Sequence, residues 1–391
     1  MSDPDRPRPL DGILVADFSR VLAGPLAAMN LSDLGAEVIK VERPGSGDET
    51  RSWGPPHWDA PDGTREATYY LALNRDKQSV ALDLTDPDDL AVARELASRA
   101  DVVIDNFRPG LMASFGLDHD SLAAEDPSVV TCTVTAFGSA GEASSIPGYD
   151  LLAQAMSGIM HMTGSPDGPP TRAGIPVTDV MTGLYATIGI TAALTERERT
   201  GRGRHIEVSL FDSALAGLIN HSTAVMLGGA SPMRDQNRHY SISPYALYRA
   251  ADGDLIIAAA NDKLFALVCE VIERPDLIEH PDYVTNAQRR RNDVALAAEI
   301  EAALAAAPVA EWASRFRAAG VPAGPVNSIE EALAWGEAMG IEPLVNGPDG
   351  YRAIRSPILI DGEVPGECAR PPALDEHGAE LRARFAPRTS P

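Results

Sequence analysis

Short apolar runs alternate with helix-type patterns over the first 140 residues, and this alternation constrains the fold more than any other feature. Residues 12–18 (GILVADF) are strand-like, residues 26–35 repeat apolar side chains at helical spacing and end at a glycine, and residues 37–42 (EVIKVE) are strand-like again. The order returns in SVALDL, DPDDLAVARELASRA and DVVIDNF, and SVVTCTVTAF adds a β-branched run. Strands that alternate with helices form parallel sheets covered on both faces, so we expect a large α/β, Rossmann-like domain.

Ligands of open parallel sheets bind beyond the carboxyl ends of the strands. The loops after VIKVE, VVIDNF and TCTVTAF are therefore the places where a site is expected. In the first of these loops, PGSGDET matches neither a dinucleotide fingerprint nor a phosphate-binding loop. In the last, GSAGE lacks the G-x-S-x-G spacing of a hydrolase, which indicates that Ser139 is a turn residue.

A second region begins near His221. The segment YALYRAADGDLIIAAA contains two strand-like runs joined by Asp252 and Gly253, the sequence of a hairpin turn, and helical patterns follow from Lys263 and Val294. These elements predict a smaller α+β domain inserted before the chain returns to the first. The proline- and charge-rich tail is expected to wrap around the protein rather than pack into it. The predicted boundaries are 1–210 and 345–391 for the large domain, 225–330 for the small domain, and 211–224 and 331–344 for linkers.

The composition of the 391 residues argues against several classes of protein. The chain carries 56 Asp and Glu against 33 Lys and Arg, and this net charge of −23 disfavours nucleic acid as a partner. The N-terminus MSDPDRPRPL has acids and prolines where a signal peptide has a basic and then an apolar region, and no apolar run approaches the ~18 residues of a membrane span. We therefore expect a cytoplasmic protein without a membrane partner.

Cysteine and histidine patterns give no indication of a metal site. Cys132, Cys269 and Cys368 are far apart and form no C-x-x-C pair, so we interpret all three as packing residues. The eight histidines are scattered, and no two lie at the spacing of metal ligands. No metal is expected.

A single ionisable residue stands in the middle of the stretch RAGIPVTDVMTGLYATIGI, namely Asp179. The preceding GIPV is extended by a proline and a β-branched valine, and a long helical pattern follows, so Asp179 is expected where a strand passes into a helix. Helix amides would favour its ionised form, and the strand end would direct it towards the ligand cleft. Simple N-capping is the alternative, because aspartate is a preferred cap, and the local pattern does not decide between them.

Six segments in the same order resemble the family III coenzyme A transferases. They are LDGILVADFSRVLAGPLAAMNLSDLGAEVIKVERPGSGDETRSWGPP, LNRDKQSVALDL, ADVVIDNFRPG, GYDLLAQAMSG, TDVMTGLYA and RTGRGRHIEVSLFDSAL. The resemblance extends from about residue 10 to about residue 372. It implies that the protein transfers CoA from an acyl-CoA thioester to a carboxylic acid, and that Asp179 is the covalent nucleophile.

An aspartate suits this chemistry. With its ordinary pKa of ~3.9 it is ionised at neutral pH and attacks a thioester without a separate base, which gives an acyl-aspartyl mixed anhydride and CoA thiolate. The thiolate then either attacks the aspartyl carbonyl and forms an aspartyl-CoA thioester, or stays bound while the acceptor acid displaces the donor acid from the anhydride. Water would hydrolyse either intermediate, so the site has to close, and residues 227–231 (LGGAS) are a candidate lid.

The resemblance also implies contacts with CoA, which is expected as a substrate and not as a permanently bound cofactor. Arg43, Lys77 and Arg108 are cations at strand ends and suit the phosphates, with ordinary surface charge as the alternative. The expected contacts are Arg43, Leu73, Asn74, Arg75, Lys77, Asn106, Phe107, Arg108, Phe137 and Tyr149.

The chain departs from the family pattern at two points. Residues 113–114 (Ala-Ser) stand where relatives often have a basic residue, which puts the arrangement of phosphate contacts in doubt. Leu22 stands where oxalate-specific relatives have glutamine, so formyl-CoA and oxalate are disfavoured as substrates.

Two other functions share parts of the pattern. α-Methylacyl-CoA racemases resemble the chain too, but they have an acid–base histidine where this sequence has Tyr149, and a phenol with a pKa of about 10 is a poor base at neutral pH. Asp262 in AANDKLF falls near a carboxylate that racemases use, which keeps racemisation as the alternative. A non-catalytic acyl-CoA binding protein is disfavoured because Asp179 is intact.

The resemblance further implies a homodimer of two interlocked chains, with active sites built between the subunits. Threading of this kind would explain the connecting segments at residues 211–244 and 320–350, which are longer than ordinary connections. The expected partners are thus an acyl-CoA donor, a carboxylic acid acceptor and a second copy of the chain.

Overall fold

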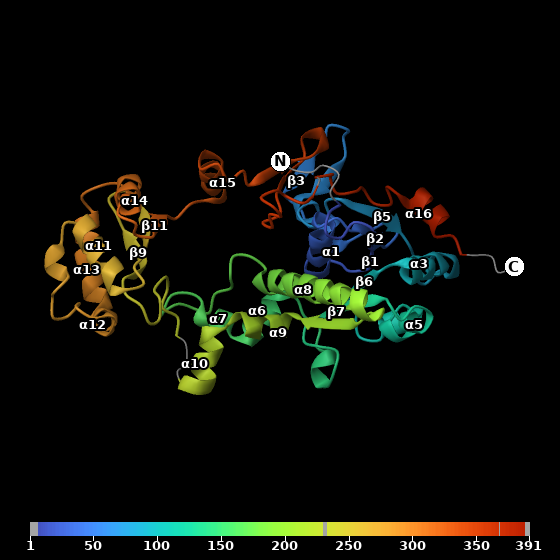
Figure 1. Cartoon of the computed structure of the whole chain (residues 1–391), viewed down its shortest axis with the longest axis horizontal. Helices are drawn as coiled ribbons and strands as arrows, with labels where there is room; N and C mark the ends of the chain where they lie inside the picture. Colours follow the sequence, from blue (N-terminus) through green and yellow to red (C-terminus); the bar gives the residue numbers. More distant parts are fainter. Residues whose placement is uncertain (1–6, 230–232, 367, 388–391) are drawn as a thin grey trace. The chain divides into compact units, whose positions relative to one another are not determined.

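The computed structural model describes residues 7–229, 233–366 and 368–387. Of these, residues within 1–160, 172–222 and 342–391 form one compact unit, and those within 161–171 and 223–341 form another (Figure 1). Residues 161–171, which the sequence placed in the large domain, group with the second unit. So does helix α15 (Ile329–Ala338), which occupies most of an expected linker.

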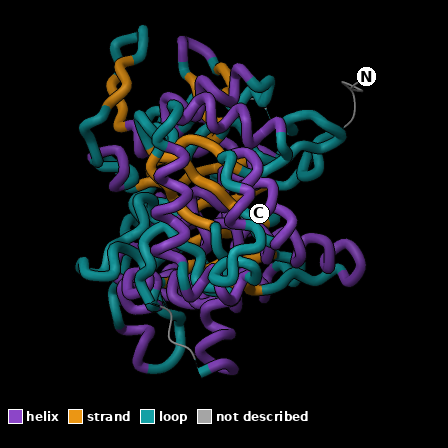
Figure 2. Tube along the Cα trace, turned by 90° about the vertical axis from the view of Figure 1, so that its left-hand side faces the viewer, coloured by secondary structure: helices purple, strands orange, loops and turns teal. Residues whose placement is uncertain are grey.

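The first unit is built on a six-stranded sheet with the order β5-β2-β1-β6-β7-β8. Every neighbouring pair in it is parallel, so the predicted parallel α/β architecture is confirmed. Both views show helices beside these strands (Figures 1 and 2). The strands are β1 (Leu14–Asp17), β2 (Glu37–Glu42), β5 (Lys77–Ala81), β6 (Val102–Asp105), β7 (Val130–Thr135) and β8 (His205–Ser209).

Each face of this sheet has its own apolar core, because successive strand residues point to opposite sides. Val15 and Val38 pack on one face against helices α1 (Ala23–Asp33) and α8 (Val177–Thr200). Their chain neighbours Ala16 and Ile39 pack on the other face, mainly against α3 (Pro87–Arg99). The sheet is thus covered on both sides, as the alternating pattern predicts.

The C-terminal tail packs into the first unit, which corrects the expectation that it only wraps. Helix α16 (Gly378–Arg384) buries Leu381, and Phe385 follows it into the core under α3. The carboxylate of Asp375 accepts a hydrogen bond of 2.8 Å from the backbone of Ala81 in the edge strand β5. The tail therefore covers backbone groups that an open sheet edge would expose.

Helix α8 differs from its expected surroundings in two ways. No strand precedes it, because residues 172–176 form a loop and the helix begins at Val177. Within the described residues α8 is long and apolar enough to cross a membrane by length and composition. The sequence expectation counted uninterrupted apolar runs, which Asp179 and the small polar residues break without making the helix polar. In this structure one side of α8 packs against α1, β7 and β8, while other apolar residues of the helix are exposed.

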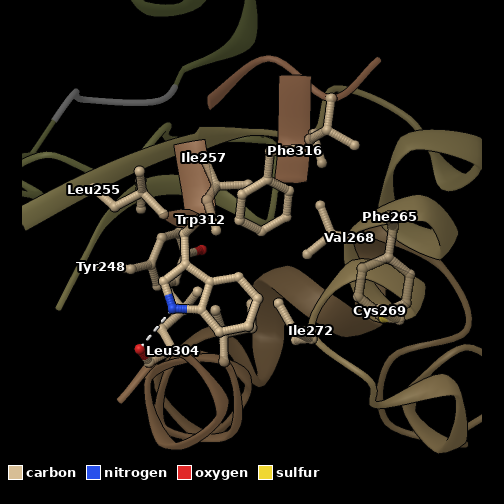
Figure 3. Close-up of a cluster of buried hydrophobic side chains, with 14 of the residues drawn as sticks. Tyr248, Leu255, Ile257, Phe265, Val268, Cys269, Ile272, Leu304, Trp312 and Phe316 are labelled. Carbon is tan, nitrogen blue, oxygen red and sulfur yellow. Dashed lines mark hydrogen bonds between the residues drawn. The ribbon is translucent and has the colours of Figure 1, made fainter. Parts of the chain in front are cut away.

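The second unit contains a three-stranded sheet with the order β11-β10-β9. Strands β9 (Tyr245–Arg249) and β10 (Asp254–Ala258) pair antiparallel, which confirms the predicted hairpin. Trp312 fills the core beside this sheet, and its indole N–H donates a hydrogen bond of 2.8 Å to the carbonyl of Leu304 (Figure 3). The other elements of this unit are α10 (Asn220–Gly228, from its fourth residue on), α11 (Asp262–Val271), α12 (Asn286–Arg291), α13 (Asp293–Leu304), α14 (Val309–Ala318), β11 (Ala323–Pro325) and α15.

Helices occupy parts of the segments expected to be long connectors. Helix α9 (Leu210–Gly217) and helix α10 lie in the first, and α15 lies in the second. The stretches without regular structure are therefore shorter than the sequence suggests. The remaining helices and strands are β3 (His57–Asp59), β4 (Arg65–Ala67), α2 (Thr68–Leu71), α4 (Leu111–Phe115), α5 (His119–Glu125), α6 (Asp150–Ser157), α7 (Ile159–Met162), β12 (Leu344–Asn346) and β13 (Arg352–Ile354).

The three cysteines have the packing role that the sequence predicts. Cys132 and Cys269 are buried in the cores of the first and second units, and Cys368 packs beside Tyr351 in a small cluster. All three are free thiols. Over the described part of the chain, no group of three or more His, Cys, Asp or Glu side chains is placed to hold a metal ion.

Candidate active site

The strand order reverses between β1 and β6, so the loops after these two strands meet at a switch point of the sheet. Two hydrogen bonds join them there. The backbone N–H of Arg20 donates to Oδ1 of Asn106 at 2.9 Å, and Nδ2 of Asn106 donates to the carbonyl of Arg20 at 2.7 Å. The sequence analysis named the loop after β6 but not the loop after β1.

A cavity of about 720 Å³ opens at this switch point. Its walls include Arg20 and Leu22 from the loop after β1, Ala23 at the start of α1, and residues 106–109 from the loop after β6. Asp179 lines it from the first turn of α8. The cavity brings together five residues that the sequence analysis selected: Asn106, Phe107, Arg108, Tyr149 and Asp179.

A glycine places Asp179 beside the loop after β1. Gly183 lies one turn beyond Asp179 on α8, where a Cβ would stand 2.9 Å from the carbonyl oxygen of Ala23. Any larger side chain would push α8 away from the start of α1. The close approach at Gly183 therefore fixes the distance between Asp179 and the opposite wall of the cavity.

The N-terminus of α8 is capped by a residue from another helix. Oδ1 of Asp150 accepts hydrogen bonds from the backbone N–H of Thr178 at 2.9 Å and from its hydroxyl at 2.7 Å. The carboxylate of Asp179 has no hydrogen-bond or ion-pair partner among the described residues. In this structure Asp179 is not the cap, and its carboxylate is available to a ligand.

The environment of Asp179 shifts its pKa strongly. Burial first, and then the negative charge of Asp150, raise the pKa of Asp179 to about 7. The sequence predicts an ordinary, fully ionised aspartate, because the residues next to Asp179 in the chain reveal neither its burial nor the nearby carboxylate of Asp150. Burial and the charges of Asp179 and Asp150 also raise the pKa of Tyr69 to about 12, so Tyr69 is a neighbour of the site that the sequence analysis missed.

The loop after β1 is held in a strained conformation. Val21, which lines the cavity, has a φ of 70°, a region that β-branched residues rarely adopt. Its backbone N–H lies 3.3 Å from both carboxylate oxygens of Asp48, which is buried and ion-paired with Lys40 at 2.9 Å. Nζ of Lys40 also donates to the carbonyl of Ser19 at 2.9 Å. Buried charges thus fix the backbone of this wall.

Comparison with known proteins assigns the chain to a family. Residues 10–378 match the model of CoA-transferase family III. The chain belongs to this family. It is 39% identical to a mouse succinyl-CoA:glutarate CoA-transferase, over 95% of this chain and 85% of that protein. It is 40% identical to an Acetobacter aceti acetyl-CoA:oxalate CoA-transferase, over 98% of this chain and 97% of that protein.

A solved structure supports the same assignment. A CaiB/BaiF family protein from Brucella suis matches the chain with a TM-score of 0.88 and 38% identity, over 97% of this chain and 100% of that one. The fold and the family that the sequence analysis expected are confirmed.

Within this family III chain, the segment expected to contact CoA after α2 lies inside the protein. Nζ of Lys77 is fully buried and donates to Asp17, to the carbonyl of Pro25 and to Asn74. Arg75 is buried and ion-paired with Asp33 at 2.6 Å. Leu73 and Asn74 are buried as well, so the side chains of this segment are engaged inside the protein, and its contact with CoA stays a prediction.

Of the other expected contacts, Arg43 lines a cavity and Phe137 does not. Arg43 is exposed and lines a smaller cavity of about 290 Å³, which Phe107 also lines. Phe137 instead packs against Phe211, with ring centroids 5.9 Å apart, and lines none of the described cavities. Gly148 lies against this ring, and a Cβ there would stand 2.8 Å from Phe137.

Two further predictions fall in the second unit. Asp262, the carboxylate kept for the racemase alternative, is ion-paired with the buried guanidinium of Arg289 at 2.5 Å. The candidate lid at residues 227–231 lies partly outside the described residues, which end at 229 and resume at 233.

Proposed function

We propose that this family III transferase moves CoA from an acyl-CoA thioester to a carboxylic acid through a covalent intermediate on Asp179. The carrying observation is a carboxylate that lines the switch-point cavity without a described partner. The other carboxylate in that cavity, Glu49, is paired with Arg20 at 3.3 Å. Asp179 is therefore the better nucleophile of the two.

The reaction needs no external proton or electron. An oxygen of ionised Asp179 attacks the thioester carbonyl, the carbon–sulfur bond breaks, and CoA leaves as the thiolate. The thiolate attacks the aspartyl carbonyl of the anhydride, which releases the donor acid as its carboxylate and leaves an aspartyl-CoA thioester. The acceptor carboxylate then attacks the aspartyl carbonyl and displaces the thiolate, which gives an anhydride between the acceptor and Asp179. The thiolate attacks the acceptor carbonyl of this anhydride, so that the acceptor acyl-CoA forms and Asp179 is released. In the second route the acceptor displaces the donor directly on the anhydride.

Relatives and cavity together suggest small acids as substrates. The mouse relative is named for succinyl-CoA and glutarate, and the Acetobacter relative for acetyl-CoA and oxalate. Leu22 and Ala23 give this side of the cavity an apolar wall without an amide group. We infer that the carbon chain of the acid packs on this apolar side of the cavity.

The structure gives the racemase alternative little support. Proton abstraction next to a thioester needs two opposed acid–base groups. Tyr149 takes the place of the racemase histidine, and the carboxylate of Asp262 is engaged by Arg289. Transfer on Asp179 requires neither group.

A panel of acyl-CoA donors against carboxylic acids tests the proposed function. We expect CoA to appear on at least one acceptor acid, with ping-pong kinetics if the donor acid leaves before the acceptor binds and sequential kinetics if the acceptor displaces it on the anhydride. In heavy water, a donor incubated without acid should keep the hydrogen next to its thioester carbonyl. Deuterium incorporation at that carbon, with no transfer to any acid, would replace transfer by racemisation.

We further propose that the enzyme is a homodimer. Apolar side chains stand exposed on two helices of the first unit: Leu151, Leu152 and Met156 on α6, and Leu184 and Ile188 on α8. The two helices are neighbours, and exposed apolar side chains that gather in one region are typical of a protein interface. Sedimentation at micromolar concentration should give twice the chain mass of 41.4 kDa, without dissociation on dilution. A stable monomer would contradict this proposal.

A further inference from the structure

Two cavities of the first unit meet at the same pair of side chains. Arg20 and Phe107 line both the Asp179 cavity and the smaller cavity beside Arg43. The smaller cavity has aromatic and aliphatic walls, among them Phe18 and Leu82, together with charged side chains such as Arg43 and Asp83. A substrate that occupies both cavities has to pass Arg20.

The covalent order of CoA decides which of its groups passes there. Adenosine is followed by the diphosphate, then by pantetheine and the thioester. When the thioester faces Asp179, the nucleoside reaches the smaller cavity, whose aromatic walls suit a flat base. The segment that crosses the junction then carries the diphosphate. We propose that Arg20 binds the diphosphate of CoA, an inference that rests on the proposed role of Asp179.

Arg20 is held ready for such a ligand. Its backbone is fixed by the two hydrogen bonds with Asn106, and its guanidinium lies 5.1 Å from the centre of the Phe107 ring. The side chain nevertheless remains 46% exposed. A planar guanidinium fixed in this way offers two parallel N–H groups to phosphate oxygens at little entropic cost.

The charge of the protein makes a local cation necessary. A chain with a net charge of −23 repels an anionic substrate, so binding depends on cations placed at the site. Lys77, one of the three cations expected at the phosphates, is buried in an ion pair, and so is the neighbouring Arg75. Arg20 carries an exposed partner, Glu49, which a diphosphate can displace because the pair is open to solvent.

Substitution of Arg20 tests the proposal directly. Arg20→Ala should weaken CoA binding in calorimetry and raise the KM for acyl-CoA, each about tenfold, as expected for loss of a charge-assisted contact. The KM for the acid should stay unchanged. Glu49→Gln should act in the opposite direction and tighten CoA binding about twofold, because it frees the guanidinium.

Truncated donors identify the group that is bound. With an acyl-dephospho-CoA, which keeps the diphosphate, the effect of Arg20→Ala should persist. With an acyl-pantetheine, which has no phosphate, it should vanish. Arg249→Ala is the matched control: it removes the same charge from an exposed pair in the second unit and should leave CoA binding unchanged.

Three results would overturn the assignment. They are unchanged CoA binding in a folded Arg20→Ala protein, an effect that persists with acyl-pantetheine, and an effect lost with acyl-dephospho-CoA, which would point to the 3′-phosphate. Failure of the proposed transferase function would give another result. CoA binding would still depend on Arg20, but the native enzyme would transfer CoA to no acid.

Discussion

Asp179→Asn should abolish CoA transfer, with a loss of several orders of magnitude in kcat, while the protein folds normally. Asparagine has the shape of aspartate but no attacking carboxylate oxygen, so the covalent route closes. Steady-state transfer assays measure the loss. A variant that keeps a tenth or more of native activity would contradict a nucleophilic role.

The same variant should also melt at a higher temperature than the native protein above pH 7. The pKa of Asp179 is raised from its ordinary value in the folded protein, so its contribution to stability is full below about pH 4 and is lost as pH rises through about 7. Asparagine does not titrate and avoids that loss. The melting advantage should therefore grow between pH 4 and pH 8, whereas loss of a capping group would lower the melting temperature throughout.

Transfer should fall steeply on the acid side of neutrality. Only ionised Asp179 attacks the thioester, and burial with the nearby charge of Asp150 sets its pKa to about 7. Below that pH, kcat/KM should drop about tenfold for each pH unit. The profile is measured with a donor and an acid that do not titrate in the range.

Asp150→Asn provides the control for this profile. Removing the Asp150 charge should lower the pKa of Asp179 and move the inflection to lower pH, while an amide oxygen can still accept from Thr178. An inflection that stays near 7 in this variant would assign the titration to another group.

The fold could be predicted, and Asp179 could be singled out as a candidate, because both leave local marks in the sequence. Alternation of apolar runs and helical patterns gives the sheet, and strand ends such as 102–105 point to the loops that form the site. Asp179 stands out because an ionisable side chain is costly to bury among apolar residues and is therefore uncommon in such a stretch. The two-residue turn at Asp252 and Gly253 gives the hairpin.

Other parts depend on which segments meet in space, which one sequence does not state. Lys77 reads as a surface cation, but its ammonium lies in the interior, because Asp17 from a different strand reaches it at 3.0 Å. Arg20 and Tyr69 carry no local mark and belong to the site only through the switch point and α8. The cap on α8 comes from Asp150, 28 residues earlier in the chain.

The most direct test of the account is the covalent intermediate itself. The native enzyme is incubated with an acyl-CoA donor and no acceptor acid, quenched with hydroxylamine, digested, and examined by mass spectrometry. We expect a hydroxamate on Asp179 and none in the Asp179→Asn variant, because an anhydride or thioester on the aspartyl carbonyl reacts with the amine. A native enzyme that transfers CoA at full rate without ever labelling Asp179 would contradict it.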